Sequence, residues 1–212
     1  MHTNWNSDEL NRIEATTLEY YDANAESYWQ GTKDHDVTQN IESFLAACVA
    51  EKSLDILDFG CGPGRDIKYF ESLGHFPTGL DGSEEFFRFA RRYTNSPILH
   101  QTFLNLKLLK EQFDGIFSNA SLFHIPSQEL HRVLIELRGT LRPHGILFCS
   151  NPRGDGEGWQ GQRYGHYMEL NTIQSYMEAA GFEIIHHYYR PEDKPRSEQP
   201  WLAIVCKSKG SD

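Results

Sequence analysis

The segment that most constrains the fold lies at residues 54–64, where a short apolar run leads directly into a glycine turn. Residues 54–59 have the pattern of a buried strand, the turn carries Gly60, Gly62 and Gly64, and a helical pattern follows at 65–73. Glycine is needed where a backbone turns sharply or approaches a ligand closely. A strand, a glycine turn and a helix in series therefore predict a ligand site beyond the carboxyl end of this strand.

Strand and helix patterns alternate along the rest of the chain and indicate its fold class. We expect strands at 54–59, 77–81, 97–101, 113–119, 146–150, 182–190 and 201–207. Helical patterns lie between them, at 38–50, 65–73, 83–93, 127–141 and 172–180. This alternation predicts an α/β fold with a largely parallel sheet, in a single domain that spans residues 1–212. The last two strands are joined without a helix, which suits an antiparallel pair at the edge of the sheet.

The composition narrows the range of partners. A formal net charge of −10 and a pI near 5.4 disfavour nucleic acid. No apolar run approaches the roughly 18 residues that a membrane span needs, and the polar start predicts no signal peptide, so we expect a cytoplasmic protein. The four cysteines lack metal-ligand spacing, and the adjacent His186 and His187 would point to opposite faces of a strand, so no metal is expected. A small-molecule substrate and a monomer or homodimer are the remaining expectations.

The details of the glycine turn decide which ligand it suits. In a dinucleotide fingerprint the sixth position, counted from Gly60, would be glycine or alanine, but it is Arg65 here. Pro63 also has no N–H to offer a pyrophosphate. Asp58 suits a ligand with a sulfonium and an ammonium group, and Asp81, at the end of the second strand, is placed to accept both hydroxyls of a ribose. These features predict S-adenosylmethionine as the cofactor, with S-adenosylhomocysteine as its product.

Five motifs in order resemble those of class I S-adenosylmethionine-dependent methyltransferases. They lie at 57–64, 79–81, 113–117, 141–145 and 180–182, and the resemblance covers about residues 40–207. It implies a Rossmann-like mixed sheet of seven strands in the order 3-2-1-4-5-7-6, with strand 7 antiparallel and helices on both faces. It also implies that the three glycines of the turn bracket the methionine portion of the cofactor and that Asp81 binds its ribose.

The resemblance places the adenine after the third strand, where many members of the family carry an acidic residue. Here the equivalent residues are Thr102 and Phe103, so we expect a weaker hydrogen bond from Thr102 and stacking by Phe103. The other residues expected to bind the cofactor are Tyr28, Asp58, Cys61, Gly82 and Asn119.

Two segments are candidates for the substrate side. In the family that the chain resembles, residues 119–124 face the methyl group, and His124 is the candidate base or substrate hydrogen-bonding group, with an ordinary pKa near 6.5. A histidine packed at a loop–helix junction is the alternative. The glycine-rich, charged segment 151–159 predicts a substrate loop, with a plain solvated loop as its alternative. We expect Arg153 to hold a substrate carboxylate through two hydrogen bonds, with Asn151 beside it and Tyr164 and Tyr167 as a further wall.

Residues 1–37 are expected to form an N-terminal helical lid over the cofactor. Residues 20–29 are rich in aromatic side chains and similar to the lid segment of many such enzymes. Tyr28 would contact the cofactor, and Tyr21 and His35 would reach the substrate when the lid closes and excludes water. An aromatic helix packed on the core is the alternative.

The resulting prediction is a methyltransferase that acts on a small molecule by in-line transfer to a nitrogen, oxygen or sulfur atom. Arg153 favours a carboxylate-bearing acceptor such as an amino-acid derivative. A thiol-histidine N-methyltransferase of the ovothiol type is a more specific candidate. An NAD-dependent oxidoreductase and a non-catalytic cofactor-binding partner subunit are the alternatives from other classes.

Overall fold

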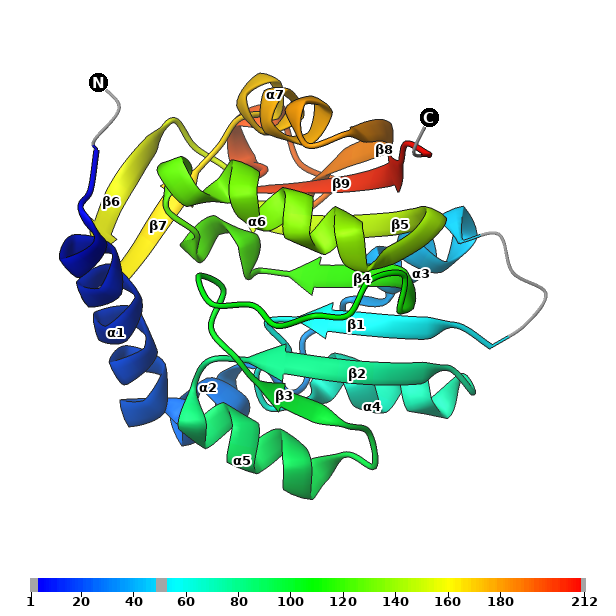
Figure 1. Ribbon diagram of the computed structural model, residues 1–212, viewed down its shortest axis with the longest axis horizontal. Coiled ribbons are helices and arrows are strands. Elements are labelled where there is room, and N and C mark those ends of the chain that lie inside the picture. The colour runs from blue at the N-terminus through cyan, green and yellow to red at the C-terminus, as the bar shows by residue number, and fades with distance from the viewer. Residues whose placement is uncertain (1–3, 49–52, 211–212) are drawn as a thin grey trace.

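A seven-stranded sheet forms the centre of the protein in a computed structural model that describes residues 4–48 and 53–210 (Figure 1). The strand order is β3-β2-β1-β4-β5-β9-β8, with β9 antiparallel to both β5 and β8. The seven strands are β1 (Asp55–Phe59), β2 (Phe76–Asp81), β3 (Ile98–His100), β4 (Phe113–Asn119), β5 (Leu141–Pro152), β8 (Phe182–Arg190) and β9 (Trp201–Ser208). This arrangement confirms the expected seven-stranded mixed sheet, because β8 and β9 take the places of its sixth and seventh strands.

Helices cover both faces of the sheet and bury its apolar side chains. On one face, Leu57 and Phe59 of β1 share an apolar cluster with α6 and α7. On the other face, Ile56 packs with α3 and α4, because successive side chains of a strand point to opposite sides. The helices of the two layers are α3 (Thr38–Ala47), α4 (Arg65–Ser72), α5 (Glu84–Tyr93), α6 (Ser127–Thr140) and α7 (Leu170–Ala179).

The parallel register brings the functional ends of the first strands to one edge. Phe59 of β1 pairs with Leu80 of β2, and Asp58 pairs with Phe117 of β4. The glycine turn after β1, the acidic end of β2 and the loop after β4 therefore meet at the carboxyl edge of the sheet.

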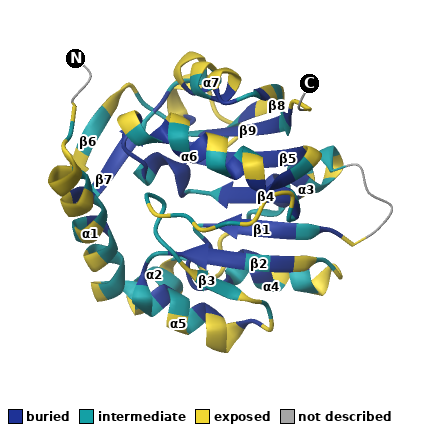
Figure 2. Ribbon diagram, viewed as in Figure 1, coloured by how far each residue is buried: buried dark blue, intermediate teal, exposed yellow. Residues whose placement is uncertain are grey.

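Two N-terminal helices and a β-hairpin lie at the carboxyl edge of the sheet (Figure 1). They are α1 (Ser7–Ala23) and α2 (Ala25–Thr32), followed much later in the chain by β6 (Gly156–Gln160) and β7 (Arg163–Tyr167). Asn6 starts α1 with a capping box, in which its side chain accepts from the amides of Asp8 and Glu9. Figure 2 shows that α1 exposes its outer side while the central strands behind it are buried. The position of α1 matches the predicted lid, and its role as a lid stays a prediction.

The β6–β7 hairpin is the main departure from the predicted elements. The segment 151–159 was expected to be a loop, but β5 continues to Pro152 and residues 156–160 form a strand. β3 is shorter than predicted, and α3 ends at Ala47 rather than at residue 50, which lies outside the described residues. In the described ranges, no helix has the length and apolar character to cross a membrane.

Candidate active site

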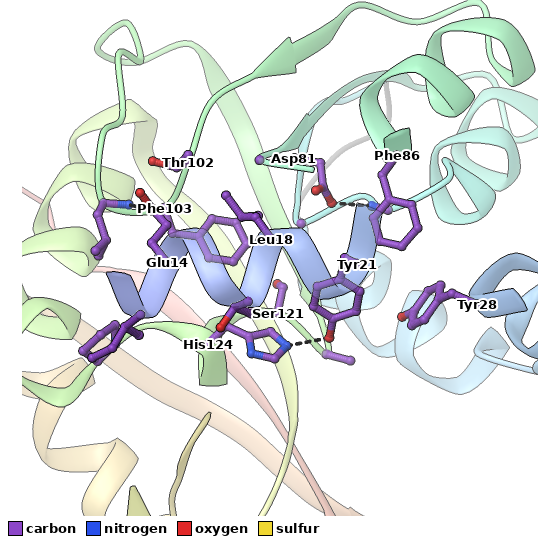
Figure 3. Close-up of a pocket in the computed structure, with 18 of the residues that line it drawn as sticks. Glu14, Leu18, Tyr21, Tyr28, Asp81, Phe86, Thr102, Phe103, Ser121 and His124 are labelled. Carbon is purple, nitrogen blue, oxygen red and sulfur yellow. Dashed lines mark hydrogen bonds between the residues drawn. The ribbon is translucent and has the colours of Figure 1, made fainter. Parts of the chain in front are cut away.

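A pocket with about 730 Å³ of empty space, partly open to solvent, lies between α1 and the carboxyl ends of β1, β2 and β4 (Figure 3). Helix α1 forms one side, and the loops after β1 to β4 form the other. The lining residues are Ile13, Glu14, Thr17, Leu18, Tyr21, Tyr28, Gly60, Gly62, Asp81, Gly82, Phe86, Thr102, Phe103, Leu104, Asn119, Ala120, Ser121, His124 and Pro126.

The glycine turn has the backbone conformation that its sequence predicts. Gly60, Gly62 and Gly64 all have positive φ angles, of 81°, 53° and 92°. A Cβ atom on Gly60 would lie 2.3 Å from the Cβ of Ser121, so this position has no room for a side chain. Gly60 and Gly62 line the pocket. Gly64 begins α4 behind the turn, and the Cys61 side chain packs there with Ile67, so neither of these two lines the pocket.

Asp81 is held in place by two backbone amides. Its Oδ2 accepts from the N–H of Gly62 at 2.8 Å, and its Oδ1 accepts from the N–H of Ser83 at 2.9 Å. Burial raises the pKa of Asp81 to about 6, and the two amide hydrogen bonds act in the opposite direction. The carboxylate thus joins the glycine turn to the start of α5, and Gly82 beside it also lines the pocket.

A second acidic group lies beneath the turn. Asp58 is buried, and among residues 4–48 and 53–210 its Oδ2 has no hydrogen-bond partner. Burial raises the pKa of Asp58, the neighbouring Asp66 adds to this, and Arg65 opposes it. Asp66 Oδ1 accepts a hydrogen bond from Arg65 Nε at 2.7 Å, and Asp66 Oδ2 accepts one from the side-chain amide of Asn119 at 3.3 Å. Asn119 lines the pocket and Asp58 does not, so Asp58 is a buried acidic group below the turn.

His124 is held in one tautomer by its two neighbours. Its Nδ1 lies 2.6 Å from the backbone carbonyl oxygen of Tyr164, which can only accept, so Nδ1 carries the hydrogen. Burial lowers the pKa of His124 to about 4, so the ring is neutral near pH 7. Its Nε2 therefore accepts from the hydroxyl of Tyr21, which lies at 2.7 Å (Figure 3).

The predicted tyrosine wall supports the pocket from behind. The side chain of Tyr164 is buried, its N–H donates to Thr17 Oγ1 at 3.1 Å, and its hydroxyl accepts from Trp5 Nε1 at 3.3 Å. The ring of Tyr167 packs against Phe123 with 5.8 Å between centroids. Tyr164 and Tyr167 are not among the lining residues, and they connect the β6–β7 hairpin to α1 and to the His124 loop.

Three further residues predicted to bind substrate, in addition to Tyr164 and Tyr167, lie outside the pocket. Arg153 donates to Glu169 Oε1 at 2.8 Å and to the carbonyl oxygen of Arg196 at 2.7 Å, so its guanidinium is already engaged away from the pocket. Asn151 is buried, and its Oδ1 accepts from the N–H of Phe123 at 3.2 Å. His35 is exposed and borders a separate surface depression beside Arg65.

Sequence reasoning predicted Tyr21 but missed the other residues that α1 contributes to the pocket. Five α1 residues line it at helical spacing, namely Ile13, Glu14, Thr17, Leu18 and Tyr21. The sequence signal for these residues is the helical spacing of positions 13, 17, 18 and 21, a stripe that shares one face of α1 with the acidic residue 14. A carboxylate in such a stripe indicates a side chain that faces a site rather than solvent.

The comparisons with known proteins agree with this geometry. Residues 57–149 match the family described as "Methyltransferase domain". A malonyl-[acyl-carrier protein] O-methyltransferase of Pectobacterium atrosepticum is 34% identical over 107 residues, which is 50% of this chain and 42% of that protein. A ubiquinone biosynthesis O-methyltransferase of Roseobacter denitrificans is 30% identical over 155 residues, which is 67% of this chain and 62% of that protein. The chain thus spans less than two thirds of these relatives.

Solved structures share the fold over nearly the whole chain. The 1,6-didemethyltoxoflavin-N1-methyltransferase of Burkholderia thailandensis, with 1,6-didemethyltoxoflavin and S-adenosylhomocysteine bound, has a TM-score of 0.76 at 20% identity. It covers 98% of this chain and 93% of its own. An S-adenosylmethionine-dependent methyltransferase of Leishmania major has a TM-score of 0.78 at 16% identity, with 92% and 83% covered.

The fold, the glycine turn and the acidic end of β2 define a nucleoside-binding α/β domain. The match of residues 57–149 to the methyltransferase-domain family, together with the relatives and the shared fold, supports a class I S-adenosylmethionine-dependent methyltransferase domain with S-adenosylmethionine as its cofactor.

Proposed function

We propose that this chain transfers the methyl group of S-adenosylmethionine to a small molecule bound between α1 and the loop that carries His124. The observation that carries the proposal is the meeting of Gly60, Gly62, Asp81 and His124 around one pocket beneath α1. The names of two similar proteins, the ubiquinone biosynthesis enzyme and the toxoflavin enzyme, support a small acceptor. The formal charge of −10 supports an acceptor other than nucleic acid.

The pocket residues fit the chemistry of S-adenosylmethionine. Asp81 keeps lone pairs for the two ribose hydroxyls after accepting from the amides of Gly62 and Ser83. Below the glycine turn lie the carboxyl group of Asp58, whose Oδ2 has no hydrogen-bond partner among the described residues, and the side-chain amide of Asn119. Both are polar groups near the place where the ammonium and sulfonium groups would lie. The aromatic rings of Tyr21, Tyr28 and Phe86 add faces that attract a sulfonium.

Methyl transfer needs alignment more than acid–base chemistry. When bound, S-adenosylmethionine supplies a methyl group on a sulfonium, and the acceptor's lone pair forms the new bond while the electron pair of the broken carbon–sulfur bond stays on sulfur. The chain's contribution is to hold both partners in line and to exclude water beneath α1. Proximity of this kind is worth about 7–11 kcal/mol of the barrier.

The Tyr21–His124 pair is suited to an acceptor that loses a proton. As the new bond forms, the acceptor's proton becomes strongly acidic and passes to the Tyr21 oxygen, while the phenol's own proton passes to His124 Nε2. Only a strongly acidic proton can charge this imidazole, because burial lowers its pKa to about 4, and the imidazolium keeps its Nδ1–H on the carbonyl of Tyr164. This arrangement favours a hydroxyl, a thiol or a neutral N–H group as the nucleophile, because each has a lone pair and a proton to lose. The Arg153 contacts described above remove the main support for a carboxylate clamp, so we do not extend the proposal to an amino-acid acceptor.

Two measurements test the proposed function. Calorimetry should detect binding of S-adenosylhomocysteine to the wild-type protein and much weaker binding to Asp81→Ala. Incubation with a metabolite extract and methyl-labelled S-adenosylmethionine should then yield a labelled small molecule by mass spectrometry. Binding of NAD(H) without binding of S-adenosylhomocysteine would overturn the cofactor, and label found only in macromolecules would overturn the acceptor class.

A further inference from the structure

Glu14 brings a carboxylate from α1 to the end of the pocket that lies beyond β3 (Figure 3). Its Oε1 accepts from the N–H of Leu104 at 3.2 Å. The hydroxyl oxygen of Thr102 is buried beside it and makes no hydrogen bond of normal geometry in the described part of the chain, although it is close enough to lower the pKa of Glu14. An acidic residue from a helix some ninety positions upstream thus completes this end of the pocket.

The pocket lining beside Glu14 is largely apolar, and the part of it between Phe103 and Leu18 is called the slot here. Phe103 stacks on Phe59 with 4.4 Å between ring centroids and 25° between the planes, and it lines the pocket. Leu18 closes the slot from α1, so near to Gly82 that a Cβ there would lie 3.0 Å from Leu18 Cδ2. A slot between an aromatic ring and an aliphatic side chain suits a planar base.

The distribution of carboxylates over the pocket indicates what Glu14 binds. Two of the lining residues, Glu14 and Asp81, are acidic. S-adenosylmethionine carries three kinds of hydrogen-bond donor, namely the ribose hydroxyls, the ammonium group and the exocyclic amine of adenine. Asp81 is placed for the ribose and the region under the glycine turn is placed for the ammonium. The adenine amine is the remaining donor, and Glu14 is the remaining acidic acceptor.

We infer that Glu14 accepts a hydrogen bond from the exocyclic amine of the cofactor's adenine, so that α1 supplies base recognition to a site otherwise built by the strand loops. This inference rests on the proposed function. It makes the docking of α1 and the binding of adenine mutually dependent, because the acceptor leaves the site when the helix does.

Burial of the carboxyl group does not weaken this role. Burial raises the pKa of Glu14, and the Thr102 hydroxyl, the Leu104 amide and the charge of Arg132 act in the opposite direction. A carboxyl group keeps an acceptor oxygen in either protonation state. The hydrogen bond to the Leu104 amide uses one oxygen of Glu14 and leaves lone pairs on the other for the amine.

A ligand pair that differs at the amine edge of the base tests the inference. The probes are S-adenosylhomocysteine and its hypoxanthine analogue, in which a carbonyl oxygen replaces the exocyclic amine and the neighbouring N1 carries a hydrogen. Wild-type protein should bind the adenine compound about 10- to 100-fold more tightly, as expected for one hydrogen bond to a charged group. In Glu14→Gln, the new side-chain N–H₂ can donate to the analogue's carbonyl oxygen, so the preference should fall by at least tenfold. Gln also keeps an acceptor for the Leu104 amide.

A matched control separates recognition from helix stability. Glu19→Gln makes the same change at an exposed position of α1 and should keep the wild-type preference. Because each preference is a ratio within one protein, partial unfolding of a variant cancels out. An unchanged ratio in Glu14→Gln, with tight binding of S-adenosylhomocysteine to the wild type, would overturn the role of Glu14 and leave the proposed function intact. Failure of the wild type to bind S-adenosylhomocysteine would instead overturn the proposed function.

Discussion

The hydroxyl of Tyr21 lies 2.7 Å from Nε2 of His124, and this contact joins α1 to the loop after β4 across 103 positions of the chain. The backbone carbonyl of Tyr164 holds the opposite side of the imidazole, so three separate segments fix one neutral histidine. The proposed reaction centre is therefore complete only when α1 and the β6–β7 hairpin are both in place.

Tyr21→Phe tests the proposed path of the proton. The change removes the hydroxyl and keeps the ring, so turnover should fall by about 10- to 100-fold while the affinity for S-adenosylhomocysteine changes little. His124→Ala should lower turnover at least as far. Tyr20→Phe is the matched control, because the Tyr20 ring lies under Arg163 and is absent from the pocket lining. Unchanged turnover in Tyr21→Phe would show that the acceptor needs no proton path through this residue.

Much of the fold could be predicted because its signals are local. Short apolar runs such as 54–59 and 113–119 end in turns, and glycines stop the helices between them, so both the elements and their order follow from the sequence. The β6–β7 hairpin could not be predicted in this way. Glycines and charged residues lower its intrinsic strand preference, and it is held by distant contacts, such as the Tyr164 amide donating to Thr17.

The difference between local signals and contacts of distant residues also explains which site residues could be predicted. Gly60 follows β1, Asp81 is the last residue of β2 and His124 lies in the loop after β4. Their place at the carboxyl edge of one sheet makes them neighbours. Glu14 reaches the pocket because α1 crosses the sheet edge. The stripe around Glu14 marks one face of α1 but does not specify where this helix docks. The Arg153 guanidinium could bind a substrate carboxylate, but it forms an ion pair with Glu169 instead. The spacing of these two residues in the sequence did not identify them as partners.

Asp81 should give cofactor binding and protein stability opposite responses to pH. Its pKa is raised by burial from 3.8 to about 6, so between these values the folded protein binds the proton that the unfolded chain releases. The contribution of Asp81 to the unfolding free energy therefore increases as the pH falls from about 7 to 5. Ribose recognition favours the ionised carboxylate, so the affinity for S-adenosylhomocysteine should decrease over the same range.

Titration of the wild type and of Asp81→Asn checks this prediction. Calorimetry gives the affinity, and urea unfolding at the same pH values gives the stability. The neighbouring Asp22 and His100 also act on Asp81, so the comparison uses the difference between the two proteins rather than either curve alone. If both proteins show the same pH dependence of affinity, Asp81 is not the titrating group.

Asp22 should control how firmly α1 docks on the domain. Its Oδ1 accepts from the Ser83 hydroxyl at 2.6 Å and from the Glu85 amide at 3.1 Å, so the end of α1 is tied to the first turn of α5. Asp22→Ala removes both bonds, and we expect a loss of about 1–2 kcal/mol from helix docking, similar to the loss of a helix cap. Hydrogen exchange should become faster in α1 and remain unchanged in β4. Equal acceleration in both segments would indicate global destabilisation instead.

The glycines of the chain offer a test in which the structure predicts opposite results for the same substitution. Gly60→Ala places a Cβ 2.3 Å from Ser121 at a φ of 81°, so it should destabilise the protein by about 2–4 kcal/mol and abolish cofactor binding. Gly31→Ala, near the end of α2, meets nothing within 4 Å, and it should be neutral or stabilise by up to about 1 kcal/mol.

Gly62→Ala has open space around its Cβ but a φ of 53°, and it lines the pocket. Gly62→Ala should lose affinity for S-adenosylhomocysteine with a smaller loss of stability than Gly60→Ala. Urea unfolding and calorimetry on the three variants check this order, and a Gly60→Ala protein as stable as the wild type would contradict the geometry of the turn.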